Sequence, residues 1–258
     1  MCLGNMITDH VSESQLSMWQ RCPRQWQYRY VQGLKMRPSG ALIEGSCYHK
    51  SLEVNFTQKK VTFEDLPVDD CLDAFSTEWS RVMSESEDVD WRGMKPEAVK
   101  NEGHSLVRTY MTVMAPNVQP IEAEEWYISK IADVVFVMRI DLINDVGTVI
   151  DHKTSSKSYN QADVDRDMQA SAAAYSLERP IIFENHVAVK SSHPKIQLIK
   201  TVRTREDIAW WLDTSSAIVQ QMKSGIAPPR PTGWHCSPEW CGYYEMCRGG
   251  LVRGYWGA

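Results

Sequence analysis

Residues 134–155, VVFVMRIDLINDVGTVIDHKTS, decide the fold of this chain. The stretch contains two runs rich in β-branched and other apolar residues, which is typical of β-strands. Residues 144–147, Asn-Asp-Val-Gly, lie between the two runs and supply a turn. The stretch therefore predicts an antiparallel hairpin in an α/β core.

Two aspartates and a lysine lie at the ends of these apolar runs. Asp141 ends the first run, and Asp151, His152 and Lys153 follow the second. Residues two apart on a strand face the same way, so Asp151 and Lys153 point into one site. His152 then points away and leaves its backbone carbonyl near that site. Asp141 can reach the same place, and two carboxylates with a carbonyl are oxygen ligands that Mg²⁺ or Mn²⁺ prefers.

Such a site has a definite chemistry. A bound ion can polarise a phosphodiester and lower the pKa of an attacking water, and Lys153 can stabilise the charge that develops. His49 and Glu53 are four apart in GSCYHKSLE (residues 45–53), and a neutral His49 imidazole could complete the metal shell. The plainer interpretation is a structural histidine, two strand-end aspartates and a surface lysine.

The remaining sequence predicts helices before the hairpin and mixed elements after it. Ser12 and Gln15 resemble a capping box for a first helix, which Pro23 interrupts. Thr204 and Asp207 resemble a second capping pair. Further helices are expected at about 40–58, 66–86, 96–114, 163–178 and 204–225, and further strands at 124–131, 181–190 and 195–202.

Composition fits a globular, intracellular protein. The chain of 258 residues is 43% hydrophobic, with ten Trp and ten Tyr, which is ample for a packed core. No run approaches the roughly 18–20 apolar residues of a membrane helix, and residues 1–15 lack the regions of a secretory signal. The net charge of -5 argues against a protein that coats nucleic acid through bulk charge, but it leaves a nuclease open.

Three of the seven cysteines, Cys236, Cys241 and Cys247, lie in a Pro-, Gly- and Cys-rich tail without helical or strand period. Such a tail cannot pack a core alone, so something must hold it. A tetrahedral zinc or a cubane iron–sulfur cluster needs a fourth ligand. Cys22, beside Pro23, can turn its thiol outward at a helix end.

The other cysteines are weaker candidates for the fourth ligand. Cys2 is terminal, and Cys47 and Cys71 lie within helical patterns, which indicates small core residues. His235 could also replace a thiolate. Spacing alone does not separate an iron–sulfur cluster from zinc or from three unrelated buried thiols.

Cationic and aromatic residues interleave around Cys22, in WQRCPRQWQYR (residues 19–29). This mixture suits single-stranded DNA, in which bases stack on rings and phosphates contact Arg. A helix with an aromatic core face and a basic solvent face is an equal alternative. The expected DNA contacts are Arg21, Arg24, Tyr28, Lys50 and Lys157.

Together and in this order, these motifs resemble the PD-(D/E)XK nuclease superfamily over nearly the whole chain. The similarity begins with SESQLSMWQRCPRQWQYRY (residues 12–30) and a G-x-x-x-H motif that ends at His49. It continues with Asp141, with Asp151 and Lys153 as the D-x-K motif, and with the three-cysteine tail. The chain looks like the RecB-type branch that carries an iron–sulfur cluster, which includes the AddB nuclease domain, CRISPR-adaptation nucleases and phage exonucleases.

The resemblance implies a restriction-endonuclease-like fold, with a central mixed sheet flanked by helices. It implies a single domain with a mainly helical lobe (residues 1–120), an α/β catalytic core (121–225) and a cluster-binding tail (226–258). It implies that Mg²⁺ or Mn²⁺ binds to His49, Asp141, Asp151 and the backbone carbonyl of His152. It implies catalytic roles for Asp141, Asp151, Lys153 and Gln169, and a 4Fe–4S cluster on Cys22, Cys236, Cys241 and Cys247.

Three positions depart from the family pattern. Relatives often carry a glycine just before the strand aspartate, where this chain has Met-Arg-Ile at 138–140. The acid of the D-x-K motif is Asp151, where relatives frequently use Glu. The motif Q-x-x-x-Y keeps Gln169, but Ala173 occupies its last position and the tyrosine falls at Tyr175.

The resemblance leads us to expect a Mg²⁺- or Mn²⁺-dependent DNA exonuclease that acts on single strands or DNA ends in recombination, repair or phage DNA processing. One alternative is a non-catalytic iron–sulfur module that binds DNA or assembles a complex. Another is a spacer-processing nuclease within a CRISPR adaptation complex. DNA is the expected partner, with a homo-oligomer or a recombination or CRISPR protein as further partners, in a bacterial or phage-infected cytoplasm.

Overall fold

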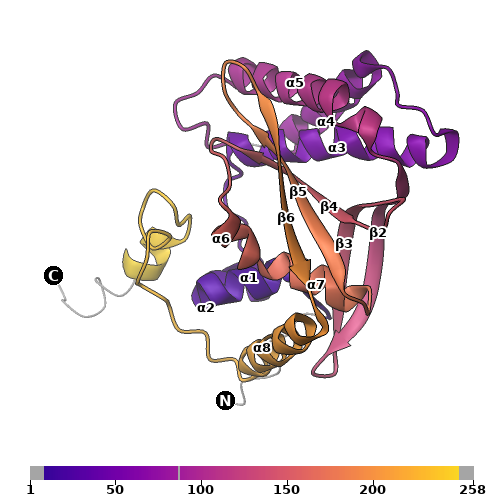
Figure 1. Cartoon of the computed structure of the whole chain (residues 1–258). Helices are drawn as coiled ribbons and strands as arrows, with labels where there is room; N and C mark the ends of the chain where they lie inside the picture. The colour runs from indigo at the N-terminus through magenta and orange to yellow at the C-terminus, as the bar shows by residue number, and fades with distance from the viewer. Residues whose placement is uncertain (1–8, 87, 250–258) are drawn as a thin grey trace. The chain divides into compact units, whose positions relative to one another are not determined.

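The structure of the chain is a computed structural model that describes residues 9–86 and 88–249 (Figure 1). Cys2 lies outside these residues. The chain divides into two compact units. Unit 1 takes residues up to 37, residues 128–138 and residues from 209 onward, and unit 2 takes residues 38–127 and 139–208.

A mixed sheet contains the strands of unit 2, and residues 128–138 of its first two strands are assigned to unit 1. In pairing order its strands are β2 (Pro120–Ile131), β3 (Val134–Asn144), β4 (Val149–Ser155), β5 (Ile181–Val189) and β6 (Lys195–Arg203). The β3–β4 and β5–β6 pairs are antiparallel, and β4 pairs parallel with β5. The hairpin predicted from residues 134–155 is therefore confirmed, as are the strands expected on either side of it.

The turn of the hairpin closes as its sequence predicts. Gly147 adopts a φ of 80°, a left-handed conformation that glycine tolerates without strain. The Asn144 side chain accepts a hydrogen bond of 2.8 Å from the backbone N–H of Thr148. The first four residues of β4 and most of β5 are buried, because inner strands of a mixed sheet are covered on both faces.

Three long helices pack against one another in unit 2, side by side in Figure 1. They are α3 (Gly40–Thr62), α4 (Val68–Glu85) and α5 (Pro96–Val113), which confirms the helices predicted over these ranges. Gly103 allows α5 to approach α4, since a Cβ there would lie 2.3 Å from Cζ of Phe75. Cys47 and Cys71 are fully buried in the apolar core between these helices, as expected of small core residues.

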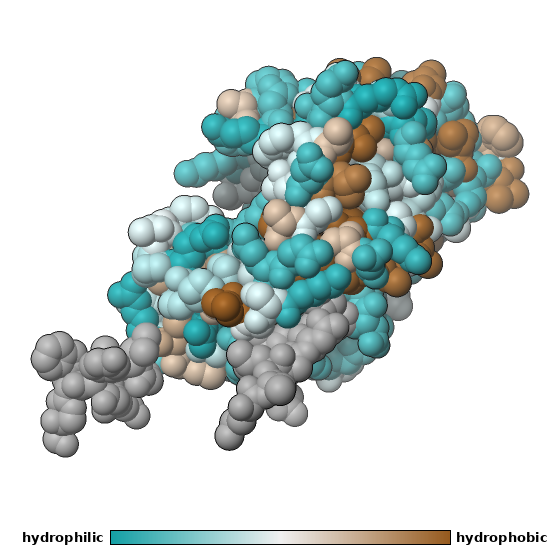
Figure 2. Space-filling model, turned by 90° about the horizontal axis from the view of Figure 1, so that it is seen from below, coloured by the Kyte–Doolittle hydropathy of each residue, from teal (hydrophilic) through white to brown (hydrophobic). Residues whose placement is uncertain are grey.

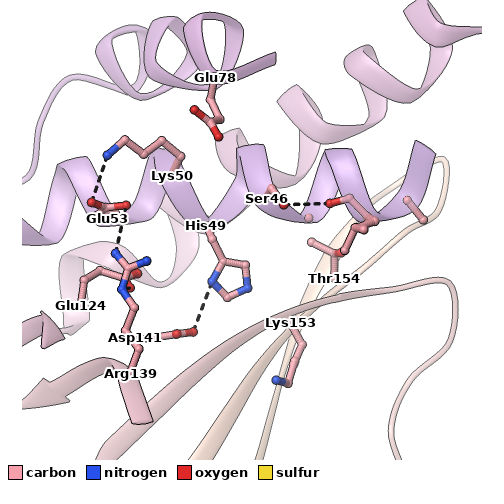
Figure 3. Close-up of a pocket in the computed structure, with 13 residues that line it drawn as sticks. Ser46, His49, Lys50, Glu53, Glu78, Glu124, Arg139, Asp141, Lys153 and Thr154 are labelled. Carbon is pink, nitrogen blue, oxygen red and sulfur yellow. Dashed lines mark hydrogen bonds and ion pairs between the residues drawn. The ribbon is translucent and has the colours of Figure 1, made fainter. Parts of the chain in front are cut away.

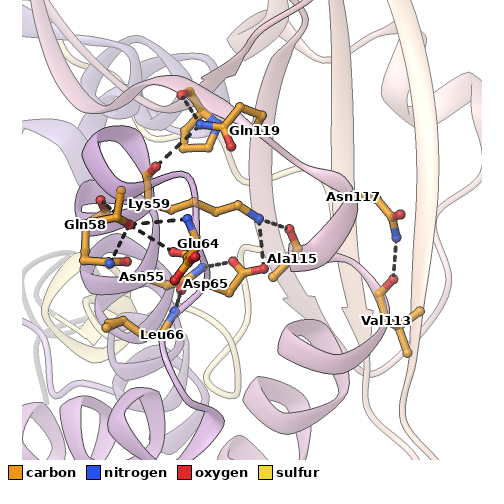
Figure 4. A network of polar contacts seen from close by, with 12 residues as sticks. Asn55, Gln58, Lys59, Glu64, Asp65, Leu66, Val113, Ala115, Asn117 and Gln119 are labelled. Carbon is orange, nitrogen blue, oxygen red and sulfur yellow. Dashed lines mark hydrogen bonds and ion pairs between the residues drawn. The ribbon is translucent and has the colours of Figure 1, made fainter.

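A buried charge ties the end of α3 to the start of the sheet (Figure 4). The Lys59 ammonium, in a residue that is only 4% exposed, donates to Asp65 at 2.8 Å and to the carbonyl of Ala115 at 2.7 Å. Asn55 donates to the same Asp65 and accepts the backbone N–H of Leu66. Such a network is favourable only when every group is paired, so it holds α3 in one position relative to the segment that leads into β2.

The Ala-rich segment expected as one helix forms two. They are α6 (Gln161–Asp165) and α7 (Met168–Ser176), with a break at Arg166 and Asp167. Asp167 has extended backbone angles, and its side chain accepts the N–H of Gln169, so it acts as an N-cap rather than a helical residue. The prediction of a continuous helix over 163–178 was wrong because this capping competes with helix propagation.

Unit 1 contains the N-terminal helices. β1 (Val11–Ser12) pairs parallel with β3 at Phe136, and it is followed by α1 (Glu13–Arg21), α2 (Pro23–Trp26) and η1 (Gln27–Val31). The interruption at Pro23 is confirmed. The predicted Ser12–Gln15 capping box is wrong, because the Ser12 hydroxyl contacts that of Ser14 and Gln15 is drawn into the core by Trp26.

The last long helix is α8 (Arg205–Lys223), and its capping pair is confirmed. Asp207 accepts the backbone N–H and the hydroxyl of Thr204, and the Thr204 hydroxyl accepts the N–H of Asp207 in return. Gly225 follows the helix with a φ of 73°. The tail then continues through turns to η3 (Glu245–Gly249).

The described part of the chain contains no helix that is long and apolar enough to cross a membrane. The face drawn in Figure 2 is mostly hydrophilic, with hydrophobic side chains interspersed among polar ones.

Candidate active site

A pocket of about 520 Å³ opens in unit 2 beside α3, β2, β3 and β4 (Figure 3). Its polar and charged lining residues are Ser46, His49, Lys50, Glu53, Glu78, Glu124, Arg139, Asp141, Lys153 and Thr154. His49, Asp141 and Lys153 are three of the predicted site residues, and the fold brings them to one cavity. Gly45 faces Thr154 with room for a Cβ, so space alone does not require a glycine in the helix motif.

Asp141 and His49 approach each other across the pocket. The His49 imidazole Nδ1 lies 3.3 Å from Asp141 Oδ2, and Figure 3 marks this contact with a dashed line. The same carboxylate oxygen accepts the backbone N–H of His152 at 2.9 Å. The β3–β4 ladder includes the pair Leu142 and Ile150. Just beyond this pair, the Asp141 side chain on β3 bonds the backbone of His152 on β4. Asp141 is thereby fixed by its own sheet.

Asp151, Lys153 and Gln169 form a ring that one ion pair and two hydrogen bonds close. The Lys153 ammonium lies 2.8 Å from Asp151 Oδ2 and donates to Gln169 Oε1 at 2.8 Å. The Gln169 amide donates to Asp151 Oδ1 at 2.5 Å. Asp151 and Lys153 therefore share one face of β4, as the alternation of a strand predicts. Gln169, at the start of α7, reaches them because the Asp167 cap fixes where that helix begins.

Burial and pairing shift the ionisation of this ring in opposite ways. Burial raises the pKa of Asp151, the positive charge of Lys153 opposes that shift, and the nearby charge of Asp141 adds to it. For Lys153, burial would lower the pKa, but the Asp151 carboxylate outweighs it and the pKa is raised. Lys153 is therefore an ammonium donor at neutral pH, oriented by two acceptors.

The ring of His152 points away from the pocket, as predicted. His152 is 2% exposed, and its ring stacks on Phe56 at a centroid distance of 5.7 Å. Its Nε2 lies 2.9 Å from the hydroxyl of Tyr110, which in turn lies 2.8 Å from Nδ1 of His186. Burial, with the neighbouring histidines, lowers the pKa of His152 well below its usual range, so the ring is neutral.

Glu124 is a site residue that sequence reasoning missed. One of its carboxylate oxygens, a nitrogen of His49 and an oxygen of Asp141 all lie within 4.8 Å of one another. Burial, and then the charge of Asp141, raises the pKa of Glu124 to about 8. Its backbone φ of 56° is unusual for a residue other than glycine inside a strand. No spacing in the sequence separates Glu124 from its exposed neighbour Glu125.

Basic side chains form one wall of the pocket. Arg139 Nε lies 2.8 Å from Glu124 Oε2, and its Nη2 lies 3.5 Å from Glu53. Lys50 pairs with the same Glu53 at 3.0 Å. Glu53 therefore pairs with two basic neighbours. Arg139 is a second pocket residue for which the sequence predicted no role in the site.

The arrangement can bind a divalent cation and act on a phosphate beside it. Carboxylates and an imidazole converge on one point, which is a donor set suited to Mg²⁺ or Mn²⁺. An ammonium group and a guanidinium flank that point and favour an anionic substrate. The residues present therefore fit the metal that the sequence motifs imply.

The four predicted cluster cysteines line one small cavity in unit 1. Cys22, Cys236, Cys241 and Cys247 contribute to it, with Tyr28, Gln25 and His235 among their neighbours. Cys22 is the residue between α1 and α2, where Pro23 ends the first helix. Burial, and then the neighbouring Cys22 thiol, raises the pKa of Cys247. The tail cysteines are therefore close to the N-terminal one despite their distance in sequence.

The residues expected to contact DNA differ in exposure. Tyr28 is only 9% exposed and packs on Tyr243 at a ring distance of 5.3 Å, so it is a core residue and cannot stack a base. Arg21 bonds Gln25, and Arg24 bonds the carbonyl of Ala227.

Trp19 and Trp26, near Cys22, match the alternative of a helix with an aromatic core face. Trp19 and Trp26 are buried edge to face at 5.0 Å, so they belong to an aromatic core face. Lys50, whose side chain is 42% exposed, lines the pocket, and Lys157 is exposed after β4.

Comparison with one solved structure supports the fold, and a second is more distant. The crystal structure of a "putative exonuclease" from Eubacterium rectale superposes with a TM-score of 0.52 at 12% identity, covering 97% of this chain and 94% of that one. The crystal structure of SSO0001 has a TM-score of 0.38 at 14% identity, covering 91% of this chain and 94% of that one. No curated protein matches the chain.

The sequence profile of the PD-(D/E)XK nuclease superfamily matches residues 10–248, which include every proposed site residue. The match spans the hairpin with its two aspartates, the helix of His49 and the tail with its cysteines. This chain belongs to the PD-(D/E)XK nuclease superfamily.

Proposed function

We propose that this chain is a Mg²⁺- or Mn²⁺-dependent DNA exonuclease that hydrolyses phosphodiester bonds at DNA ends or in single strands. One observation carries the proposal. In a member of a nuclease superfamily, Asp141 on β3 lies next to Asp151 and Lys153 on β4, and His49 from α3 and Gln169 from α7 contact them beside one pocket. A protein that only bound DNA would have no chemical need for this set of groups.

In this proposal the divalent ion would be held by His49, Asp141, Asp151 and the backbone carbonyl of His152. His49 and Asp141 line the pocket, and Asp151 lies behind them, paired with the pocket-lining Lys153. The N–H of His152 already faces Asp141, and in an antiparallel arrangement the N–H and C=O of one residue point to the same side. Glu124 offers a further carboxylate. When bound, the ion polarises the scissile phosphate and lowers the pKa of the attacking water.

The protein's own groups supply the rest of the chemistry. Lys153 keeps its proton because Asp151 raises its pKa, so its ammonium can stabilise the negative charge that grows on the phosphate oxygens. Gln169 keeps the Lys153 ammonium and the Asp151 carboxylate in a fixed geometry. The backbone N–H of His152 keeps Asp141 from rotating out of the pocket.

DNA is the proposed substrate, and we propose that basic side chains at the pocket attract its phosphates. The net charge of -5 opposes binding through bulk charge, whereas Lys50, Arg139 and Lys153 line the pocket. Lys157 is exposed just beyond β4 and can contact a phosphate outside the pocket.

We also propose that Cys22, Cys236, Cys241 and Cys247 hold a 4Fe–4S cluster. All four line one cavity in unit 1, and the tail that supplies three of them has little regular structure of its own. In this proposal residues 1–258 act as one nuclease domain, with a helical lobe (1–120), a catalytic core (121–225) and a cluster-binding tail (226–258).

Substitution of Asp151 and of Lys153 tests the nuclease proposal. Asp151→Ala and Lys153→Ala should each lower the cleavage rate of end-labelled DNA in Mg²⁺ or Mn²⁺ by about 100- to 1,000-fold or more. Asp145→Ala, which removes an exposed carboxylate in the β3–β4 turn, is the matched control and should leave the rate unchanged. Undiminished cleavage by the first two variants, with all chains folded by circular dichroism, would refute the proposal.

A further inference from the structure

An exposed tryptophan lies next to the pocket and has no part in the chemistry proposed above. Trp126, on β2, is 64% exposed, in contrast to the buried Trp19 and Trp26 that were first expected to help bind DNA. Both lie in the aromatic core, so neither presents a ring to a ligand. Trp126 does present one.

Arg139 connects the Trp126 ring to the wall of the pocket. The guanidinium carbon of Arg139 lies 5.9 Å from the centroid of the Trp126 ring, within the range of a cation–π contact. The same guanidinium lies 2.8 Å from Glu124 and 3.5 Å from Glu53. Figure 3 shows Arg139 beside both of these carboxylates. Arg139 therefore contacts both Glu124 inside the pocket and the Trp126 ring beside it.

The backbone of β2 places both groups on one short segment. Glu124 has a left-handed φ of 56°, and the two residues after it, Glu125 and Trp126, are both exposed. A regular strand would alternate between its two faces, so the alternation is broken here. Breaks of this kind re-aim side chains and occur beside active sites. The irregular backbone at Glu124 thus places the Glu124 carboxylate in the pocket and leaves the Trp126 ring exposed beside it.

A flat aromatic ring backed by a cation recognises a nucleobase. Bases stack on aromatic side chains without regard to sequence, because every base has a π face, and cations beside the ring add to the attraction. In a duplex each base is already stacked between its neighbours and paired, so it cannot lie on a protein ring. The ring face that Arg139 leaves open is therefore suited to an unpaired nucleotide.

We propose that Trp126, supported by Arg139, stacks an unpaired base of the DNA strand whose phosphate enters the pocket. Trp126 thereby directs the enzyme to single-stranded or frayed ends rather than to closed duplex. Lys50, on the pocket-lining face of α3, can contact the phosphate chain of the same strand. This inference rests on the proposed nuclease function, but it concerns substrate choice and not the chemical step.

The test measures binding of oligonucleotides in which one nucleotide at a time lacks its base. Binding is measured by fluorescence anisotropy with the Lys153→Ala chain, so that the DNA stays intact. One abasic position should weaken binding by about tenfold, and Trp126→Ala should weaken binding of the intact strand by a similar factor. The two losses should not add, because both remove the same contact. Trp126→Phe should restore most of the affinity.

Trp210→Ala is the matched control, since Trp210 on α8 is 61% exposed and does not line the pocket. It should leave single-strand binding unchanged, and Trp126→Ala should leave binding of a blunt hairpin duplex within about twofold of its original value. Equal losses for single strand and duplex, or no abasic position that couples to Trp126, would overturn the proposal.

The two proposals can fail separately. If the unsubstituted chain cuts single-stranded DNA and Trp126→Ala cuts and binds it equally well, the stacking inference is wrong and the nuclease proposal stands. If the unsubstituted chain cuts no DNA in Mg²⁺ or Mn²⁺ while the coupling between Trp126 and one abasic position persists, the nuclease proposal is wrong and the stacking inference stands.

Discussion

The pocket of unit 2 and the cysteine cavity of unit 1 are built from different kinds of side chain. In the pocket, charged and amide groups satisfy one another, as in the ring of Asp151, Lys153 and Gln169. In the cavity, thiols accept weaker contacts, such as the 3.1 Å contact from the Gln25 amide to Cys241. The pocket can therefore keep its geometry through contacts among its own residues, whereas in our proposal the tail around the cavity gains stability from the cluster that its cysteines would hold.

This difference predicts that the two regions respond to different perturbations. Unit 2 holds several buried ionisable groups, so its stability should respond to pH. In unit 1 the N-terminal segment and the tail share the cysteine cavity, so with the proposed cluster bound its stability should respond to thiol substitution and to chelation. The following experiments sharpen or break this contrast, in order of expected effect.

Replacing Cys22 should have the largest effect on stability. Cys22→Ser should lower the free energy of unfolding by about 3 kcal/mol or more, because a ligand that joins distant segments contributes its binding free energy to folding. It should also abolish the broad absorbance near ~400 nm that thiolate-bound iron gives. Thermal melting and absorption spectra of anaerobic preparations measure both effects.

Cys71→Ala is the control for Cys22, since Cys71 is fully buried in the helical core of unit 2. It should cost about 1 kcal/mol of packing and leave the absorbance intact. A Cys22→Ser chain that melts no earlier than the parent would contradict the structural role of the cavity. A colourless parent protein with stoichiometric zinc would replace the iron–sulfur proposal by a zinc site.

Glu44 should give unit 2 a distinct pH dependence. Glu44 is fully buried on α3, and burial raises its pKa to about 7 despite an ion pair with Lys190. Because the folded-state pKa is above the unfolded value of about 4.3, folding favours the protonated acid. Its contribution to stability is complete below about pH 4 and is lost as the pH rises through about 7.

Glu44→Gln should therefore become more stable than the parent as the pH rises from about 5 to 8, by up to about 3 kcal/mol, and should match it near pH 4. Urea titrations at several pH values measure the difference. Glu97→Gln, an exposed acid in the first turn of α5, is the control and should not change the slope. An unchanged slope for Glu44→Gln would show that burial does not raise the pKa of Glu44 in the folded chain.

Gln169 should have a smaller effect, confined to activity. Gln169→Ala should slow DNA cleavage by about 10- to 100-fold, since Lys153 and Asp151 keep each other but lose the amide that orients both. The melting temperature should change little. Gln161→Ala removes an amide of the same type on the preceding helix and should leave the rate unchanged. If the Gln169→Ala chain kept full activity, Gln169 would have no role in catalysis, and only Asp151 and Lys153 of the ring would contribute to it.

The sequence predicted the elements with strong local signals. The β3–β4 hairpin follows from apolar runs around Asn144–Gly147, and the start of α8 follows from the Thr204–Asp207 pair. Prediction was weaker where one residue could form either of two local structures. Asp167 has moderate helix propensity and is also a good cap, and the cap prevails. Ser12 and Gln15 match a capping box, but the core contact of Gln15 with Trp26 prevails.

By itself the sequence determined which chemical groups are present and which of them share a face. The two-residue period of a strand was enough to place Asp151 and Lys153 together and to turn His152 away. Only the tertiary structure decided which distant groups join them. Glu124 enters the pocket through a local break in β2, and Trp19, Trp26 and Tyr28 are withdrawn into the core. The physical reason is that periodicity describes one element, whereas burial and convergence depend on which elements pack together.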